Sequence, residues 1–178
     1  MDTEDLWTLI DAARAGVDDP SDSDAVAERA SGLLAARPVE DIVRAQQLLW
    51  DLMAVSYRDV LWAAAYTVNG GCSDDGFDYF RGWLITQGKK VFERVVADPD
   101  ALAELPAVRR AAAEQDELEC EETLAIAWNA HLAATGSELP GDAFSITYPA
   151  LEPGWGFDFD EAGEMGRRLP RLAALFLE

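Results

Sequence analysis

The sequence has little of what metal centres and nucleic-acid interfaces are built from. It contains one histidine, His131, and two cysteines, Cys72 and Cys120, whose separation of 48 positions is not a zinc-ligand spacing. We therefore expect no metal and no cofactor. Lysine and arginine together number 14 against 34 acids, which gives a net charge of −20. Such a charge repels phosphate backbones, so we expect no nucleic-acid ligand, whereas a basic protein partner would be attracted.

Long hydrophobic runs are also missing. The longest apolar stretch, Leu61–Val68, is far shorter than the roughly 20 residues that cross a bilayer. The first residues are acidic and lack the basic-then-apolar order of a secretory signal. We therefore expect a cytoplasmic protein that does not enter a membrane, with both cysteines as free thiols.

What is present suits one folded domain spanning residues 1–178. Hydrophobic residues make up 49% of the chain and include six tryptophans, enough for a real core. The charge is uneven: residues 1–60 carry −8 and residues 111–178 carry −11, but residues 61–110 carry only −1. The nearly neutral middle therefore stands between two acidic flanks.

Apolar residues recur at helical spacing along most of the chain. This periodicity predicts helices over residues 5–15, 24–36, 38–57, 58–68, 73–87, 90–97, 120–134 and 160–177, with short helical pieces over 100–118. The last of these helices should kink or restart at Pro170. Residues 136–159 are irregular, and only Phe144–Tyr148 there alternates as a strand would. We predict an all-α fold: a single compact multi-helix domain with an irregular segment near 136–159.

The most informative stretch is residues 69–85, where a glycine turn leads into a helix carrying acids and aromatics. Asp74 and Asp75 lie four and three residues before Asp78, so their like charges face each other unless a cation joins them. Arg81 is an intramolecular partner for Asp78. Acids at a helix start also cap it and favour its dipole, which leaves two interpretations open, capping and ligand binding. The run lacks the calcium-loop pattern.

Two residues before the glycine turn complete the candidate set. If the helices on either side of Gly70 and Gly71 return antiparallel, Asn69 and Trp62 face the surface that carries the acids. The ligand-binding candidates are Asp74, Asp75, Asp78, Arg81, Asn69 and Trp62.

Other motifs are weaker. Cys72 beside the turn could sit at a helix N-terminus, which lowers a thiol pKa, and could pair with His131, although a hydrogen-bonded histidine at the core edge is the default for that position. Residues 82–90 have the wrong spacing for a phosphate loop. Lys89, Lys90 and Arg94 form the one basic concentration, which favours a solvated patch over an anion site.

Three blocks of sequence resemble a known family. They are Trp7-x-x-Ile10; Leu61–Tyr66 with Gly70-Gly71 and Ser73–Arg81, followed by Trp83–Ile85 and Gly88; and Val91–Glu93 with Asp98-Pro99. In this order they are similar to a bacterial family known as domain of unknown function 4240. The resemblance covers about residues 4–130 and implies no established activity. The acidic C-terminal extension, about residues 135–178, has no counterpart in it.

Two functions of different classes follow from these features. The first is a non-enzymatic binding or regulatory module for a protein partner or small ligand, indicated by the acidic flanks, the neutral centre and the lack of a recognised catalytic set. The second is a small enzyme in which Asp74, Asp75 and Asp78 act as acid/base or metal groups while Arg81 anchors an anionic substrate.

Overall fold

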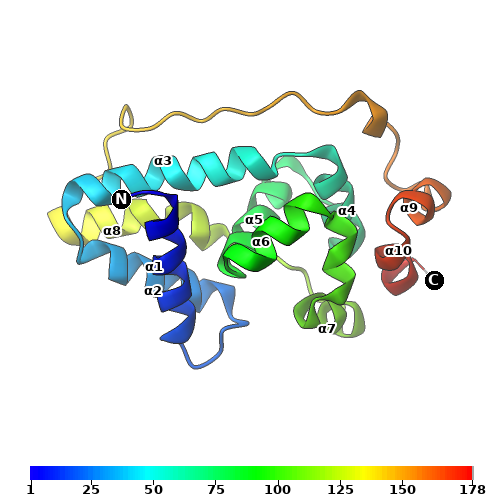
Figure 1. The fold of residues 1–178 in the computed structure, drawn as a ribbon, viewed down its shortest axis with the longest axis horizontal. Helices are drawn as coiled ribbons and strands as arrows, with labels where there is room; N and C mark the ends of the chain where they lie inside the picture. The colour runs from blue at the N-terminus through cyan, green and yellow to red at the C-terminus, as the bar shows by residue number, and fades with distance from the viewer. Residues whose placement is uncertain (178) are drawn as a thin grey trace.

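The fold, seen in a computed structural model that describes residues 1–177, is built from helices wrapped around α5 (Figure 1). Helices, 3-10 turns included, hold 70% of the residues, and none of the described residues forms a strand. The elements are α1 (Thr3–Ala15), α2 (Ser23–Ala35), α3 (Val39–Ser56), α4 (Asp59–Asn69), α5 (Asp74–Thr86), α6 (Lys89–Ala97), η1 (Pro99–Glu104), α7 (Pro106–Glu114), η2 (Glu121–Ala125), α8 (Ile126–Thr135), η3 (Pro153–Trp155), α9 (Ala162–Arg168) and α10 (Pro170–Phe176). The all-α prediction is confirmed.

Helix α5 is buried on nearly every side. It packs against α2, α3, α4, α6 and η2, and Phe77, Phe80 and Leu84 have no exposed surface. Their spacing of three and seven residues places them on one face of the helix, and this face is buried. Gly82 lets the neighbouring chain approach closely, because a Cβ atom there would stand 2.3 Å from the carbonyl oxygen of Cys120. The α5–η2 contact therefore requires glycine at this position.

The predicted helix over 120–134 differs in the structure. Its first turn is the 3-10 helix η2, and only Ile126–Thr135 is α-helical. Trp128 and Leu132, two of the large apolar residues that recur at helical spacing in this stretch, are exposed. The buried face uses Ala127 and Ala130 with Ile126 and His131. Small residues let α8 lie close to α2 and α3, and this close packing decides which face turns inward.

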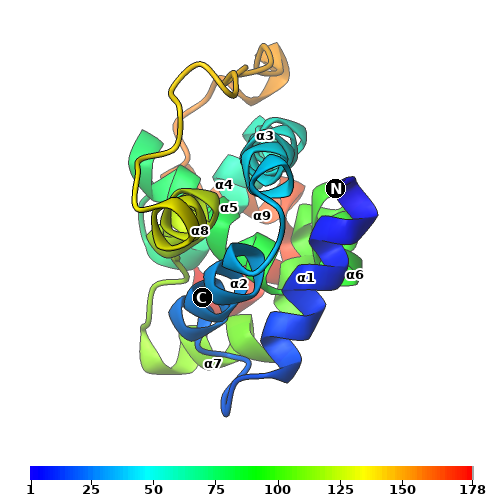
Figure 2. The same cartoon turned by 90° about the vertical axis from the view of Figure 1, so that its left-hand side faces the viewer.

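Residues 136–161, which we call the strap, connect α8 to α9 without any α-helix and contain only the short turn η3. The strap runs along the outer side of α3, away from α1 and α2 (Figures 1 and 2). The irregular segment expected near 136–159 is thus present. Phe144–Tyr148 is extended but pairs with no strand among residues 1–177.

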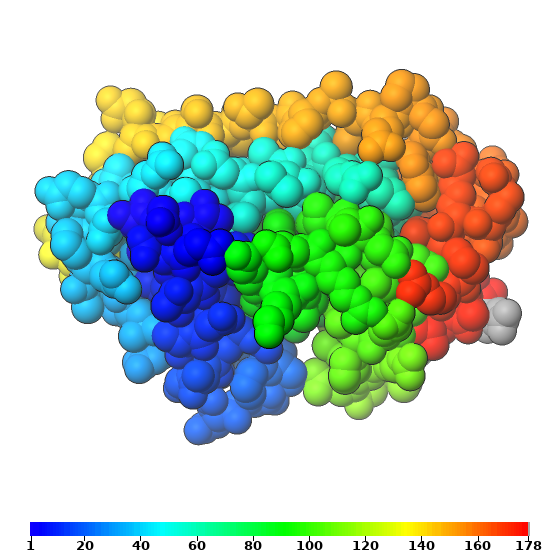
Figure 3. Space-filling view, viewed as in Figure 1, coloured from blue at the N-terminus to red at the C-terminus, as the bar shows by residue number. Residues whose placement is uncertain are grey.

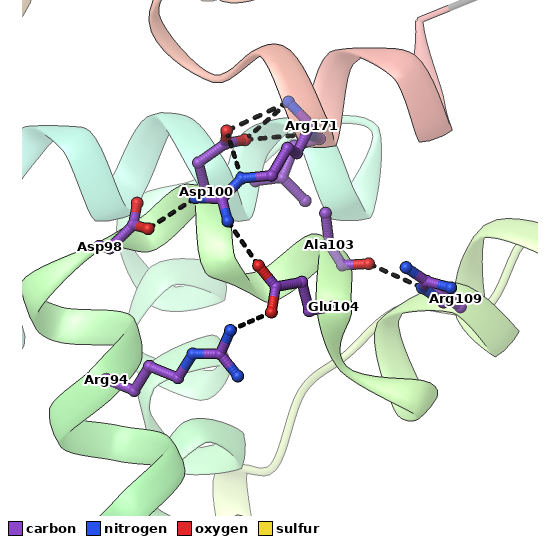
Figure 4. Close-up of polar contacts among 8 residues, drawn as sticks. Arg94, Asp98, Asp100, Ala103, Glu104, Arg109 and Arg171 are labelled. Atoms are coloured by element: carbon purple, nitrogen blue, oxygen red, sulfur yellow. Dashed lines mark hydrogen bonds and ion pairs between the residues drawn. The ribbon is translucent and has the colours of Figure 1, made fainter.

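The two C-terminal helices are tied to the middle of the chain by one arginine (Figure 4). Arg171 binds Asp98 at 2.6 Å, Asp100 at 3.0 Å and Glu104 at 2.5 Å, and Glu104 also binds Arg94. The buried Asp100 carboxylate accepts the backbone N–H groups of Arg171 and Leu172 as well. Pro170 opens α10 without an N–H of its own, so Asp100 caps this helix from a distant part of the chain.

This cap gives a stability prediction. Asp100→Ala should lower the free energy of unfolding by about 1–3 kcal/mol, because the backbone N–H groups of Arg171 and Leu172 lose their acceptor. Asp98→Ala removes only an exposed contact to the same arginine and should cost less than about 1 kcal/mol. Urea denaturation of both variants measures the difference. Equal losses would show that Asp100 does not act as a cap.

Candidate functional site

The N-terminal turn of α5 brings the predicted acids to the surface together. Ser73 is the N-cap, its hydroxyl accepting the backbone N–H of Gly76 at 3.1 Å. A serine, and not one of the aspartates of the first turn, therefore caps α5. Asp74 and Asp75 are exposed, and neither carboxylate has a hydrogen bond or ion pair with any of residues 1–177. Their charges are therefore open to a ligand.

These acids line a cleft of about 310 Å³, which we call the aspartate cleft. Its walls come from the end of α3, from α4, from α5 and from the strap. The lining residues are Tyr57, Trp62, Asp74, Asp75, Asp78 and Tyr148. Four of the six predicted candidates, Trp62 and the three aspartates, thus line one cavity.

The aromatic walls are held in place by ring contacts and one hydrogen bond. Trp62 stacks on buried Phe77 at 4.8 Å with an interplanar angle of 12°, and its indole N–H donates to the carbonyl of Cys72 at 3.0 Å. Tyr57 lies 6.0 Å from Trp62 and 4.9 Å from Tyr148, measured between ring centroids. The rings therefore form a preformed aromatic wall of the cleft that the three carboxylates also line.

Arg81 lies beneath the cleft with no exposed surface. Its guanidinium forms an ion pair with Asp78, donates to the carbonyls of Met53 and of Phe77, and lies 4.5 Å from the centre of the Phe77 ring. Burial lowers the pKa of Arg81, and the Asp78 carboxylate opposes that effect. Arginine remains charged at any ordinary pH. Its donors are directed to groups of the protein itself.

The second oxygen of Asp78 lies 3.5 Å from the hydroxyl of Tyr148. Burial, followed by the negative charge of Asp78, raises the pKa of Tyr148. The phenol therefore stays protonated and available as a donor at neutral pH. With Arg81 offsetting one of three carboxylates, the cleft keeps an excess of negative charge.

Asn69 is not part of the aspartate cleft. Its side chain accepts the backbone N–H of Leu118 at 3.0 Å and donates to the carbonyl of the same residue at 3.4 Å. We expected Asn69 to face the acids. Its side chain instead binds the backbone of Leu118 and so fixes the segment that leads to η2. Trp62 alone of the two residues before the glycine turn lies at the cleft.

Tyr57 and Tyr148 are the cleft residues that the sequence did not single out. In the sequence Tyr57 is the last residue of the predicted helix over 38–57, and its position at the cleft depends on the break between α3 and α4. Tyr148 lies 70 positions beyond Asp78 in irregular chain. The only local signal for Tyr148 was the alternation over Phe144–Tyr148.

The histidine and the basic residues that the sequence singled out make contacts away from the aspartate cleft. His131 is buried, with Nδ1 2.9 Å from the carbonyl oxygen of Ser137, as expected of a histidine at the core edge. Lys89 forms an ion pair with Glu4, and Arg94 forms one with Glu104. Both cysteines are free thiols. Within residues 1–177, no three histidine, cysteine or acidic side chains gather closely enough to hold a metal ion.

The environment of Cys72 does not favour a thiolate. Burial, followed by the nearby charge of Glu119, raises the pKa of Cys72 to about 12. Its sulfur lies 3.7 Å from the carbonyl oxygen of Ser73, a contact that suits a protonated thiol. The helix-start effect considered from the sequence is outweighed by burial and by acids.

The placement of Arg81 predicts a large loss of stability on its removal. Arg81→Met keeps the aliphatic stem but leaves Asp78 and two carbonyls without their donor, so the free energy of unfolding should fall by about 3–5 kcal/mol. Asp74→Asn removes an unpaired exposed charge and should change it by less than about 1 kcal/mol. Chemical denaturation compares the two. An Arg81→Met variant as stable as the parent would contradict the buried ion pair.

The raised pKa of Cys72 predicts slow alkylation. At pH 7.5 iodoacetamide should modify Cys72 at least about 100-fold more slowly than a free cysteine of pKa about 8.5, because so little thiolate forms. The rate of alkylation should keep rising with pH beyond 10. Mass spectrometry of the parent and of Cys72→Ser shows which modified peptide contains Cys72. An alkylation rate that stops rising near pH 8 would show instead that Cys72 is a reactive thiol with a lowered pKa.

None of the described helices is both long and apolar enough to cross a membrane. Comparison with curated proteins gives no match. Comparison with solved structures gives none either. A family model described as "Protein of unknown function (DUF4240)" matches residues 1–132, which include five of the six residues of the aspartate cleft. With about three quarters of its length matched, this chain belongs to the DUF4240 family.

Proposed function

We propose that this chain is a non-enzymatic binding module that holds a cationic side chain of a basic protein partner in the aspartate cleft. The observation that carries the proposal is the pairing of open carboxylates with fixed aromatic rings around one cavity. A cation between them gains charge-assisted hydrogen bonds from the acids and cation–π attraction from the rings. Both contributions favour arginine or lysine over a neutral side chain.

The size of the cleft and the charge of the chain support a protein partner over a free small ligand. A volume of about 310 Å³ is at the lower end for small-molecule sites and suits one long side chain. The net charge of −20 extends far beyond the cleft and would attract a basic surface from a distance. A partner with many cations gains more from this field than a single small molecule does.

The enzyme hypothesis has less support. It requires Arg81 to hold an anionic substrate, but the arginine has no exposed surface and donates to Asp78, Met53 and Phe77. An anion would also meet the unpaired charges of Asp74 and Asp75. The same geometry that disfavours an anion favours a cation.

The test uses a minimal cation and its neutral isostere. N-acetyl-arginine methylamide should bind with a Kd of about 1 mM, as followed by NMR shifts of the Trp62 indole N–H, and the citrulline analogue should bind at least about tenfold more weakly. Citrulline keeps the shape of arginine without its charge. Added salt should weaken the arginine compound.

Matched variants separate the cleft from the general charge. Asp74→Asn with Asp75→Asn should reduce binding at least about tenfold. Glu28→Gln with Glu122→Gln removes the same charge from exposed positions on α2 and η2 and should change binding less than about threefold. Equal binding of the arginine and citrulline compounds, or equal effects of the two double variants, would overturn the proposal.

A further inference from the structure

Two sets of contacts, which we call the pins, hold the strap at Ser145 and at Glu152, on either side of the residue that lines the aspartate cleft. At one end the Gln47 amide accepts the Ser145 N–H at 2.8 Å and donates to the Ser145 carbonyl at 3.2 Å. At the other end Asp59 accepts the Glu152 N–H, and Arg58 forms an ion pair with the Glu152 side chain at 3.3 Å. On the surface the strap forms a continuous band along one edge of α3, whose own atoms remain visible beside it (Figure 3).

The backbone between these pins has no hydrogen-bond partner among residues 1–177. None of the N–H or carbonyl groups from Ile146 to Leu151 takes part in a hydrogen bond within residues 1–177. The side chains are exposed too, with fractions of 46% for Ile146, 49% for Tyr148 and 38% for Leu151. An extended segment with a free backbone and apolar side chains has the properties of an exposed sheet edge.

The residues of this segment favour pairing as a strand. Ile146, Thr147 and Tyr148 are β-branched or aromatic, and Phe144, Ile146 and Tyr148 alternate along the chain. Phe144 is half-buried against the core, which holds the alternation in register. The sequence pattern of a strand is therefore present, but the described part of the chain, residues 1–177, offers no second strand to pair with it.

We propose that the strap binds an extended segment of a basic protein partner as an added β-strand along Ile146–Tyr148, and that a cationic side chain of that segment enters the aspartate cleft. The cation in the cleft rests on the proposed function; the strand pairing does not. Tyr148 belongs to both features, since it lies within the free segment and lines the cleft. Strand addition supplies affinity through the main chain, and the cleft supplies side-chain specificity.

Charge decides between a basic partner and a second copy of this chain. Two copies would bring together net charges of −20 each, and the strap from residue 136 to 161 has no lysine or arginine. Pairing of two straps would therefore be repulsive, whereas a basic segment is attracted. Pro149 has no N–H, so it limits how far the pairing extends beyond Tyr148. The two pins reduce the entropy lost when the segment is ordered against a partner.

The test uses a synthetic peptide, acetyl-Thr-Val-Thr-Arg-Thr-Val-Thr-amide, and N-methylated versions of it. A strand pairs along one edge, where the N–H groups of alternate residues point to the neighbour. Two versions, N-methylated at odd or at even positions, keep the same side chains and charge. One should lose at least about tenfold in affinity and the other should change less than about threefold. The parent peptide should slow amide hydrogen exchange at Ile146 or Tyr148.

The outcomes separate the two proposals. If both N-methylated peptides bind as the parent does and exchange of the strap amides is unchanged, the strand pairing is wrong while binding in the cleft stands. If a citrulline peptide binds as tightly as the arginine peptide but N-methylation still discriminates, the strand pairing stands and the cationic site fails. Protection of the strap amides without peptide, together with a dimer in light scattering, would replace the basic partner by a second copy.

Discussion

The buried guanidinium of Arg81 is the interaction on which the site depends. It joins α5 to the C-terminal end of α3, where the carbonyl of Met53 accepts one of its N–H groups, and it pairs with Asp78 one turn before it on α5. A cation at a helix C-terminus also complements the helix dipole. Tyr57 and Phe77 lie against its charge, with ring centres 5.1 and 4.5 Å away. One residue therefore fixes the floor of the aspartate cleft and part of its wall, and in doing so it removes itself from ligand binding.

The cleft also joins the family region to the rest of the chain. Residues 1–132 match the DUF4240 model and supply the three aspartates with Tyr57 and Trp62, while Tyr148 comes from the strap beyond it. The strap leads to α9 and α10, which the Arg171 network ties to Asp98, Asp100 and Glu104 in the family region. The last third of the chain thus contributes one wall of the cleft and is anchored at both ends of its path. The only cationic side chains in this third of the sequence are Arg167, Arg168 and Arg171, and each forms ion pairs with acids of the protein. The strap itself carries acids and no lysine or arginine.

Local patterns predicted the helices and the core well, because 3.6-residue periodicity is a property of neighbouring residues. Phe77, Phe80 and Leu84 are buried as their spacing indicated, and the chain breaks before Pro170 as a proline requires. The pattern failed for Trp128 and Leu132, because the tight packing of small residues, not side-chain hydrophobicity, set the orientation of α8. The cluster of Asp74, Asp75 and Asp78 was visible from the sequence, but Tyr148 and the true partner of Asn69 were not. Those contacts join residues 49 and more positions apart, and no periodicity specifies them.

The most direct test of this account is the hydrogen exchange of the Arg81 side chain, measured by NMR on the ¹⁵N-labelled protein. If Arg81 is buried and satisfied within the protein, its Nε–H should exchange much more slowly than that of an exposed arginine such as Arg110, and its resonance should not move on addition of phosphate or sulfate. Rapid exchange of the Arg81 Nε–H, with a shift that saturates as phosphate is added, would contradict the account, because it would mean that the arginine opens to anions and that the cleft is not selective for cations.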